Sequence, residues 1–247
     1  MIRIPSISFC ITCKDRFQQI SKTLKKNLDD NRLHKEFIEF ILVDFGSTDG
    51  LRDWIISNFI DDLKSGYLHY YYTEEQSFWH FSICKNTSHF CANNDIVVNL
   101  DCDNYVGFLG GQYVIRQFIE NRNIILHQTQ GDFLDGTYGR ISVLKDFFDL
   151  IGGYNESFEP LGFEDIDLIS RFKAIGLKYK RFSNYRFCEA IKNPRPEGFE
   201  NMSESNSKKS EANIDEGKII ANNGLYGIRN NLFDYNGHIF QKTLHIR

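Results

Sequence analysis

Two carboxylates one residue apart follow an apolar segment near the middle of the chain. Asp101 and Asp103 come directly after the run Ile96–Leu100. Side chains two residues apart on an extended chain point the same way, so the two carboxylates repel each other unless a cation lies between them. Such oxygen ligands suit Mg²⁺ or Mn²⁺, usually shared with phosphate oxygens. The pattern is also common in solvated turns, but its place at a strand end favours a metal site.

Two further polar clusters stand at the ends of predicted strands. Thr12, Lys14 and Arg16 close the first strand, where a basic side chain could pair with a phosphate, flank a base, or lie in a solvated loop. Asp44 closes the second strand. Its carboxylate could accept a hydrogen bond from a nucleobase or ribose, or cap the turn that follows, and we favour the first.

An acidic stretch opens a predicted helix in the second half of the chain. The helix dipole favours acids there, which explains its carboxylates without any function. Helical spacing nevertheless separates them, since Asp165 shares the apolar face with Phe172 while Asp167 is placed to pair with Arg171 on the surface. A carboxylate at the apolar edge of a cleft can act as a general base. We therefore predict Asp165 as the base, with Glu164 beside it holding a hydroxyl group.

The elements that would position these residues alternate between strand and helix. Hydrophobic periodicity predicts strands at Ser6–Thr12, Phe37–Asp44, Leu68–Thr73, Asp95–Leu100 and Ile124–Gln128, and helices at Arg16–Asp29, Asp49–Phe59, Phe78–Cys91 and Gly107–Glu120. This order predicts an α/β fold with a mostly parallel central sheet flanked by helices. Ligands of such sheets bind at the carboxyl ends of the strands, where the polar clusters fall.

The pattern changes after Gly131. We predict a strand at Tyr138–Leu144, a helix at Lys145–Ile151 and, near the end, a strand at Phe240–Ile246. The segment 193–217 is polar and has few aliphatic residues, so we predict a mobile loop that closes over the site.

The composition limits the classes of protein that fit. The chain has 247 residues and a formal net charge of −4, too little of either sign for a protein that coats nucleic acid. No apolar run reaches the ~20 residues of a transmembrane helix, and the start of the chain has no apolar signal core.

Aromatic residues make up 15 % of the chain, so some could line a site that stacks bases and sugar rings. Cys10 and Cys13 should face opposite sides of their strand, which favours buried packing over a metal or redox site.

Taken together, these motifs resemble the GT-A nucleotide-sugar glycosyltransferases. The first half, through Ile11–Arg16, Val43–Gly50 and Asn99–Asp103, resembles the large bacterial family-two group. The second half, through Gly152–Arg171 and Asn223–Tyr226, is similar to β-1,4-galactosyltransferases and chondroitin-polymerase-type domains. The order of the motifs is fairly specific, whereas each motif alone is not.

The resemblance implies a single GT-A, Rossmann-like domain over residues 1–247. Residues 1–130 would bind the nucleotide sugar, and residues 131–247 would bind the acceptor and supply the base. On the matching positions, Asp101 and Asp103 would hold Mn²⁺ or Mg²⁺ on a nucleotide diphosphate, and Asp101 would also contact the nucleotide sugar.

The same resemblance assigns the nucleotide side of the site. Thr12, Arg16 and Asp44 would surround the uridine. Trp79 occupies a position where these enzymes often place an aromatic ring near the base, and Asn86 would lie at the edge of the sugar nucleotide. Packing of Trp79 and an ordinary helical position for Asn86 are equally good readings.

The metal side departs from the galactosyltransferase pattern, which supplies a His after the acidic motif. No His stands between His127 and His238 in this chain. Glu189, His238 or water could take that position. By the resemblance, Glu164 would bind the acceptor and Asp165 would be the base.

The expected activity is inverting, metal-dependent transfer of a hexose or N-acetylhexosamine from a UDP-sugar to a hydroxyl of a glycan or glycolipid. A role in bacterial surface polysaccharide or lipooligosaccharide synthesis follows by analogy. We expect a cytoplasmic enzyme that binds no nucleic acid, with peripheral association with the inner face of the plasma membrane left open. The alternatives are a phosphohydrolase that uses Asp101 as nucleophile and a non-catalytic sugar-binding domain derived from a transferase.

Overall fold

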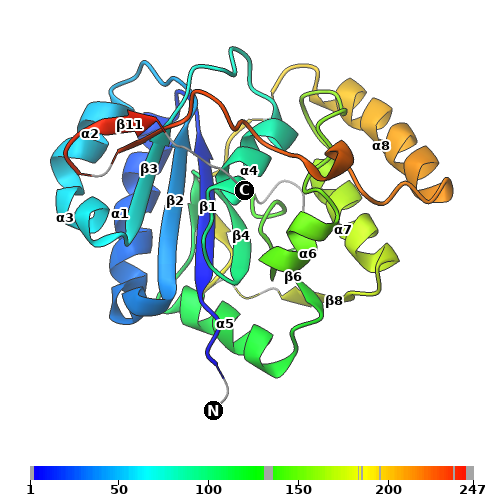
Figure 1. The fold of residues 1–247 in the computed structure, drawn as a ribbon, viewed down its shortest axis with the longest axis horizontal. Coiled ribbons are helices and arrows are strands. Elements are labelled where there is room, and N and C mark those ends of the chain that lie inside the picture. The colour runs from blue at the N-terminus through cyan, green and yellow to red at the C-terminus, as the bar shows by residue number, and fades with distance from the viewer. Residues whose placement is uncertain are drawn as a thin grey trace.

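The computed structural model describes residues 3–130, 136–182, 184, 186–194, 196–235 and 237–242. Within these residues the chain forms a nine-stranded sheet, in the order β11-β10-β3-β2-β1-β4-β7-β6-β8, and a ribbon of β5 and β9 (Figure 1). The strands are β1 Ile7–Cys13, β2 Ile38–Asp44, β3 Leu68–Tyr72, β4 Ile96–Asp101, β5 Asn104–Tyr105, β6 Ile124–Gln128, β7 Ile141–Leu144, β8 Lys178–Phe182, β9 Glu189–Ala190, β10 Phe233–Tyr235 and β11 Phe240–Lys242. The α-helices are α1 Phe17–Asn31, α2 Leu51–Asn58, α3 Ile60–Ser65, α4 Phe81–Phe90, α5 Gly110–Glu120, α6 Lys145–Leu150, α7 Glu164–Ala174 and α8 Phe199–Asp215. The 3₁₀ turns are η1 Arg32–Phe37 and η2 Asn222–Gly224.

The centre of the sheet is parallel. Strands β3, β2, β1 and β4 pair in parallel with one another in that order, and β6 pairs in parallel with β8. Strands β7, β10 and β11, all from the second half of the chain, pair antiparallel. The predicted α/β class, with a mostly parallel sheet flanked by helices, is confirmed.

Strand alternation builds one core on each face of the sheet. Helices α1, α2, α3 and α5 cover one face, where Leu24 and Phe118 are fully buried. Helices α4, α6 and α7 pack on the other, where Phe172 is fully buried. Cys13 belongs to the first core and Cys10 to the second, so the prediction that they face opposite sides is confirmed.

The predicted loop over residues 193–217 is wrong for most of its length, because α8 spans Phe199–Asp215. The prediction failed because this helix buries few aliphatic side chains, and its anchor is polar. Asn206 donates from Nδ2 to the Gly162 carbonyl at 2.8 Å and accepts at Oδ1 from the Glu159 amide at 2.7 Å. Figure 1 shows α8 at one edge of the molecule, beside α7, with which it is in contact.

An ion pair that we predicted on the surface is buried instead. Asp167 and Arg171 are 0 % and 1 % exposed, with Oδ2 and Nε 2.7 Å apart. Ser210 of α8 donates to the other oxygen of Asp167 at 2.8 Å. The pair is therefore part of the contact between α7 and α8, a helix that the sequence did not predict.

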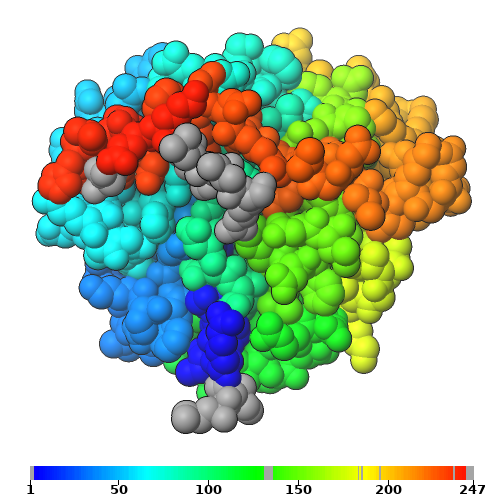
Figure 2. Space-filling view, in the orientation of Figure 1, coloured from blue at the N-terminus to red at the C-terminus, as the bar shows by residue number. Residues whose placement is uncertain are grey.

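The part of the chain after α8 returns across the molecule. Figure 2 shows it as an orange-to-red band over one face. It ends in β10 and β11, which extend the sheet beyond β3. In the residues that the structure covers, none of the helices combines the length and the apolar character needed to span a membrane.

Candidate active site at the carboxyl ends of the strands

Three strand ends meet at one edge of the sheet. The parallel register aligns Thr12 of β1 with Asp101 of β4, and Cys13 of β1 with Asp44 of β2. Because β1 lies between β2 and β4, the carboxylates of Asp44 and Asp101 end the two strands on either side of it. The structure thus brings the three predicted polar clusters to one edge.

Amide groups surround the carboxylates of Asp101 and Asp103. Asn99 donates to Asp101 Oδ1 at 3.2 Å, while Asn104 and Asn193 donate to Asp103 Oδ1 and Oδ2 at 2.7 and 2.6 Å. Burial raises the pKa of Asp101, and burial followed by the charge of Asp101 raises the pKa of Asp103 to about 6. The two carboxylates therefore repel each other in a desolvated place.

This pair of carboxylates fits a hard divalent cation, because a cation between them would relieve the repulsion that raises their pKa values. In the described ranges, no group of three His, Cys, Asp or Glu side chains is placed to hold a metal. Glu189, predicted as a third ligand, is exposed on β9, where it pairs with Tyr105 of β5. The structure does not bring Glu189 into a three-residue group with Asp101 and Asp103, and its role as a ligand stays a prediction.

A buried lysine links the two acids at the start of α7. Lys85 of α4 donates from Nζ to Glu164 Oε1 at 2.7 Å and to Asp165 Oδ1 at 2.8 Å. Burial alone would lower the pKa of Lys85, but the charges of Asp165 and Glu164 raise it well above its ordinary value. Burial raises the pKa of Glu164 to about 7, with Lys85 opposing the rise and Asp165 adding to it. The cluster holds two acids against one cation.

Gly139 lies between the two groups of carboxylates. A Cβ atom placed on Gly139 would lie 3.0 Å from Asp101 Oδ2 and 3.3 Å from Asp165 Oδ2. Both oxygens therefore lie against Gly139, one from β4 and the other from α7. Since Asp165 uses Oδ1 to bind Lys85, Oδ2 is the oxygen directed there. The residues predicted for metal binding and for proton transfer are thus brought together.

The residues predicted to surround the nucleotide differ in their contacts. Thr12 is buried at the end of β1, and Arg16 is exposed at the start of α1. Asp44 is fully buried and accepts hydrogen bonds from the Ser47 amide at 2.8 Å and the Tyr70 hydroxyl at 2.7 Å. Burial raises the pKa of Asp44. Asp44 therefore caps the turn after β2, the alternative that the sequence left open, and its contact with a nucleotide stays a prediction.

Trp79 and Asn86 lie on or just before α4. Trp79 is half-buried, with its ring edge-to-face against Phe45 at a centroid distance of 5.9 Å. Asn86 is fully buried and donates to the Tyr154 carbonyl and to Glu156 Oε1, both at 2.8 Å. It also accepts from the Tyr154 amide at 2.8 Å, so it ties the loop before α7 to α4. Their roles toward a nucleotide sugar stay predictions.

Four residues that shape this site were missed by sequence reasoning: Lys85, Gly139, Arg140 and Asn193. Arg140 is buried and donates to Asn104 Oδ1 at 2.6 Å, so it supports an amide that binds the second carboxylate. Lys85 stands out only because it is a lysine in α4, a helix whose residues are almost all buried. No spacing pattern marks Gly139 or Asn193.

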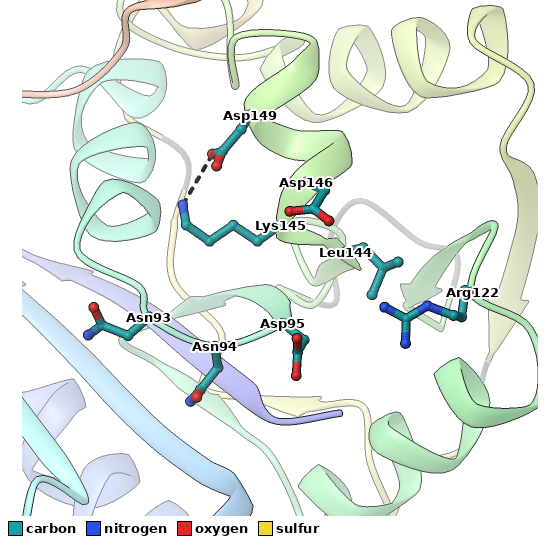
Figure 3. Close-up of a pocket in the computed structure, with 8 residues that line it drawn as sticks. All are labelled: Asn93, Asn94, Asp95, Arg122, Leu144, Lys145, Asp146 and Asp149. Atoms are coloured by element: carbon teal, nitrogen blue, oxygen red, sulfur yellow. Dashed lines mark hydrogen bonds and ion pairs between the residues drawn. The ribbon is translucent and has the colours of Figure 1, made fainter. Parts of the chain in front are cut away.

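The cavity drawn in Figure 3 lies at the opposite ends of the strands. It has a volume of about 220 Å³ and is lined by Asn93, Asn94, Asp95, Arg122, Leu144, Lys145, Asp146 and Asp149. Asp95 directly precedes β4, whereas Asp101 ends that strand. The candidate site is therefore identified by its side chains and not by this cavity.

One part of the chain matches a known family. Residues 135–193 match the N-terminal domain of galactosyltransferase. This stretch includes Gly139, Glu164 and Asp165. No curated protein sequence matches the chain.

Solved structures share the fold. The mannosyltransferase PcManGT from Pyrobaculum calidifontis, in complex with GDP-Man and Mn²⁺, has a TM-score of 0.61 and 15 % identity over 81 % of this chain and 60 % of that chain. S. aureus TarS in complex with UDP-GlcNAc has a TM-score of 0.62 and 15 % identity over 77 % of this chain and 60 % of that chain. The matched region of this chain thus corresponds to about 60 % of the length of these proteins. The predicted GT-A fold is confirmed.

Proposed function

We propose that this chain is an inverting, metal-dependent glycosyltransferase, which moves a hexose or N-acetylhexosamine from a UDP-sugar to a hydroxyl of a glycan acceptor. The observation that carries the proposal is that Asp101 Oδ2 and Asp165 Oδ2 both lie against Gly139, 3.0 and 3.3 Å from the place where its Cβ would stand. A metal-dependent, inverting transferase needs a cation site for the leaving diphosphate and a base for the acceptor within reach of one reacting centre. The GT-A fold and the galactosyltransferase match over residues 135–193 support the proposal.

Asp165 acts on the acceptor side. Its Oδ2 takes the proton from the acceptor hydroxyl while that oxygen attacks the anomeric carbon of the donor. Attack from the face opposite the leaving group converts an α-linked donor into a β-glycoside. Glu164, buried next to Asp165, orients the acceptor through a second hydroxyl.

Asp101 and Asp103 serve the donor side, where their carboxylates would hold a divalent cation at the diphosphate. When bound there, the cation would supply electrostatic stabilisation of the charge that develops on the leaving nucleoside diphosphate. Thr12, Arg16 and Trp79 are the residues that we propose around the nucleotide. The complexes of the structural neighbours with GDP-Man and with UDP-GlcNAc support a nucleotide-sugar donor.

A donor screen tests this function. The purified chain is incubated with UDP-GlcNAc, UDP-galactose, UDP-glucose or GDP-mannose, with Mn²⁺ or with EDTA, and the released nucleoside diphosphate is measured. We expect UDP release from at least one UDP-sugar with Mn²⁺ and none with EDTA. Release of inorganic phosphate instead would favour the phosphohydrolase, and sugar binding without turnover would favour a non-catalytic domain.

A further inference from the structure

The reaction described above assigns no role to Lys85, which donates hydrogen bonds to Glu164 and Asp165. Its side chain is 7 % exposed, and those of Glu164 and Asp165 are 5 % and 14 % exposed. The rings of Phe81 and Tyr154 lie with their centroids 5.5 and 5.2 Å from Nζ. An ammonium in such a desolvated place depends on its acidic partners for stabilisation, so the three charged groups hold one another in place.

The bond from Lys85 restricts the rotation of the Asp165 carboxylate. The last torsion of an aspartate side chain is soft, so an unrestrained carboxylate samples a broad range of orientations. Because Lys85 holds Oδ1, the other oxygen lies beside Gly139, on the side of Asp101 Oδ2. Lys85 also offsets the charge of Glu164, which would otherwise repel Asp165 across a short desolvated distance.

We propose that Lys85 is a positioning residue for proton transfer, which holds Asp165 with Oδ2 toward the acceptor hydroxyl while it balances the charge of Glu164. This inference rests on the glycosyltransferase function proposed above. Lys85 does not contact the reacting atoms, and it acts through Asp165. Its loss therefore slows the chemical step and leaves the binding of the donor nearly unchanged.

The chain contains a matched control. Lys145 is also buried, and its Nζ lies 3.1 Å from Asp149 Oδ1 and 3.2 Å from the His89 carbonyl. Figure 3 shows Lys145 directed toward Asp149 in the cavity at the amino ends of the strands. Replacing Lys145 removes a buried, ion-paired ammonium without touching the candidate site.

The experiment measures UDP release from the UDP-sugar that the wild-type chain turns over with Mn²⁺, with water in place of the acceptor. Lys85→Gln, Lys85→Arg and Lys145→Gln are compared for kcat, for the KM of the donor and for the thermal midpoint of unfolding. We expect Lys85→Gln to lower kcat about 100-fold, the cost of a misplaced reacting group. The KM for the donor should stay within about threefold of wild type. Lys85→Arg should recover part of kcat, and Lys145→Gln should keep the wild-type kcat.

Several results would overturn the inference. A kcat of Lys85→Gln close to wild type, a rise in donor KM as large as the fall in kcat, or an equal loss of kcat in Lys145→Gln would each do so. If Lys85→Gln does not fold, the charge-balanced variant Lys85→Gln/Glu164→Gln is compared with Glu164→Gln. We expect the double variant to be the slower of the two, and equal rates would refute the role of Lys85.

The same assay separates this inference from the function on which it rests. A wild-type chain that releases no nucleoside diphosphate from any donor refutes the proposed function and the role of Lys85 with it. An active wild-type chain together with an unaffected Lys85→Gln refutes the role of Lys85 alone.

Discussion

Buried acids at the two ends of the parallel strands have pKa values that are shifted in opposite directions. At the amino end, Glu39 of β2 accepts from Ser8 Oγ at 2.5 Å and lies 3.3 Å from His69 Nε2. Although burial alone would raise the pKa of Glu39, the bonds from His69 and Ser8 hold it below its ordinary value. At the carboxyl end, burial raises the pKa of Glu164 to about 7, and the charge of Asp165 adds to the rise.

The buried lysines of the two ends differ in the same way. Lys145 at the amino end has a partly exposed acid, Asp149, and a neutral carbonyl as partners. Lys85 at the carboxyl end faces two acids that are themselves buried. At the amino end, Glu39 and Lys145 each have partners of their own. At the carboxyl end, the single ammonium of Lys85 faces the two carboxylates of Glu164 and Asp165. Unrelieved charge of this kind is typical of functional sites, and here it distinguishes the site from the cavity at the other end.

The largest expected effect is that of replacing the base. Asp165→Asn should lower the rate of UDP release about 1000-fold, because the amide cannot accept the acceptor proton. Asp149→Asn makes the same change at the amino end and should leave the rate unchanged. Equal rates for Asp165→Asn and wild type would disprove our assignment of the base.

Adding a methyl group between the carboxylates should have the next largest effect. Gly139→Ala should lower kcat about 30-fold, since its methyl group would press on Asp101 Oδ2 and Asp165 Oδ2. Gly139 does not have a positive φ, so any fall in the thermal midpoint should come from this crowding and not from backbone strain. Asn93→Gln adds one methylene beside the cavity at the amino end and serves as the activity control. A fully active Gly139→Ala would show that the reaction does not depend on the positions of these two carboxylate oxygens.

The polar anchor of α8 should contribute stability to the carboxyl end. Asn206→Ala should lower the free energy of unfolding by about 2 kcal/mol, because it leaves buried backbone groups of the loop before α7 without their partner. The exposed Ser205→Ala on the same helix should change it by less than about 0.5 kcal/mol. Urea unfolding checks both values. Similar values for the two variants would mean that α8 is held by other contacts.

The smallest effect is a pH dependence of opposite sign at the two ends. Unfolded Glu164 releases its proton near the ordinary pKa of 4.5, while the folded chain keeps it until about 7. The folded state therefore loses stability as pH rises through this window. Because the folded pKa of Glu39 is lowered, Glu39 stabilises the fold above its ordinary pKa, and this stability is lost as pH falls.

Urea unfolding at several pH values between about 3 and 8 measures these contributions. The free energy of unfolding of wild type, minus that of Glu164→Gln, should fall as the pH rises toward neutral. The free energy of unfolding of wild type, minus that of Glu39→Gln, should fall as the pH drops toward acid. Slopes of the same sign for both variants would contradict the contrast between the two ends.

Local patterns predicted the strand-helix alternation and the ends of the central strands well. Asp101 closes β4 and Glu164 opens α7, as their neighbours in the sequence indicate. The prediction failed at α8, where no apolar periodicity exists and the helix is anchored by Asn206. It also failed for Asp167, because burial of its pair with Arg171 depends on that helix.

By itself the sequence determined which residues end the strands and open the helices, since hydrophobic period and capping are properties of neighbours along the chain. Only the tertiary structure decided that Lys85 bonds Glu164, 79 residues away, and that Asp101 and Asp165 both lie against Gly139. Such contacts depend on which helix packs beside which strand. That choice is made by the summed packing of both cores, and no local pattern records it.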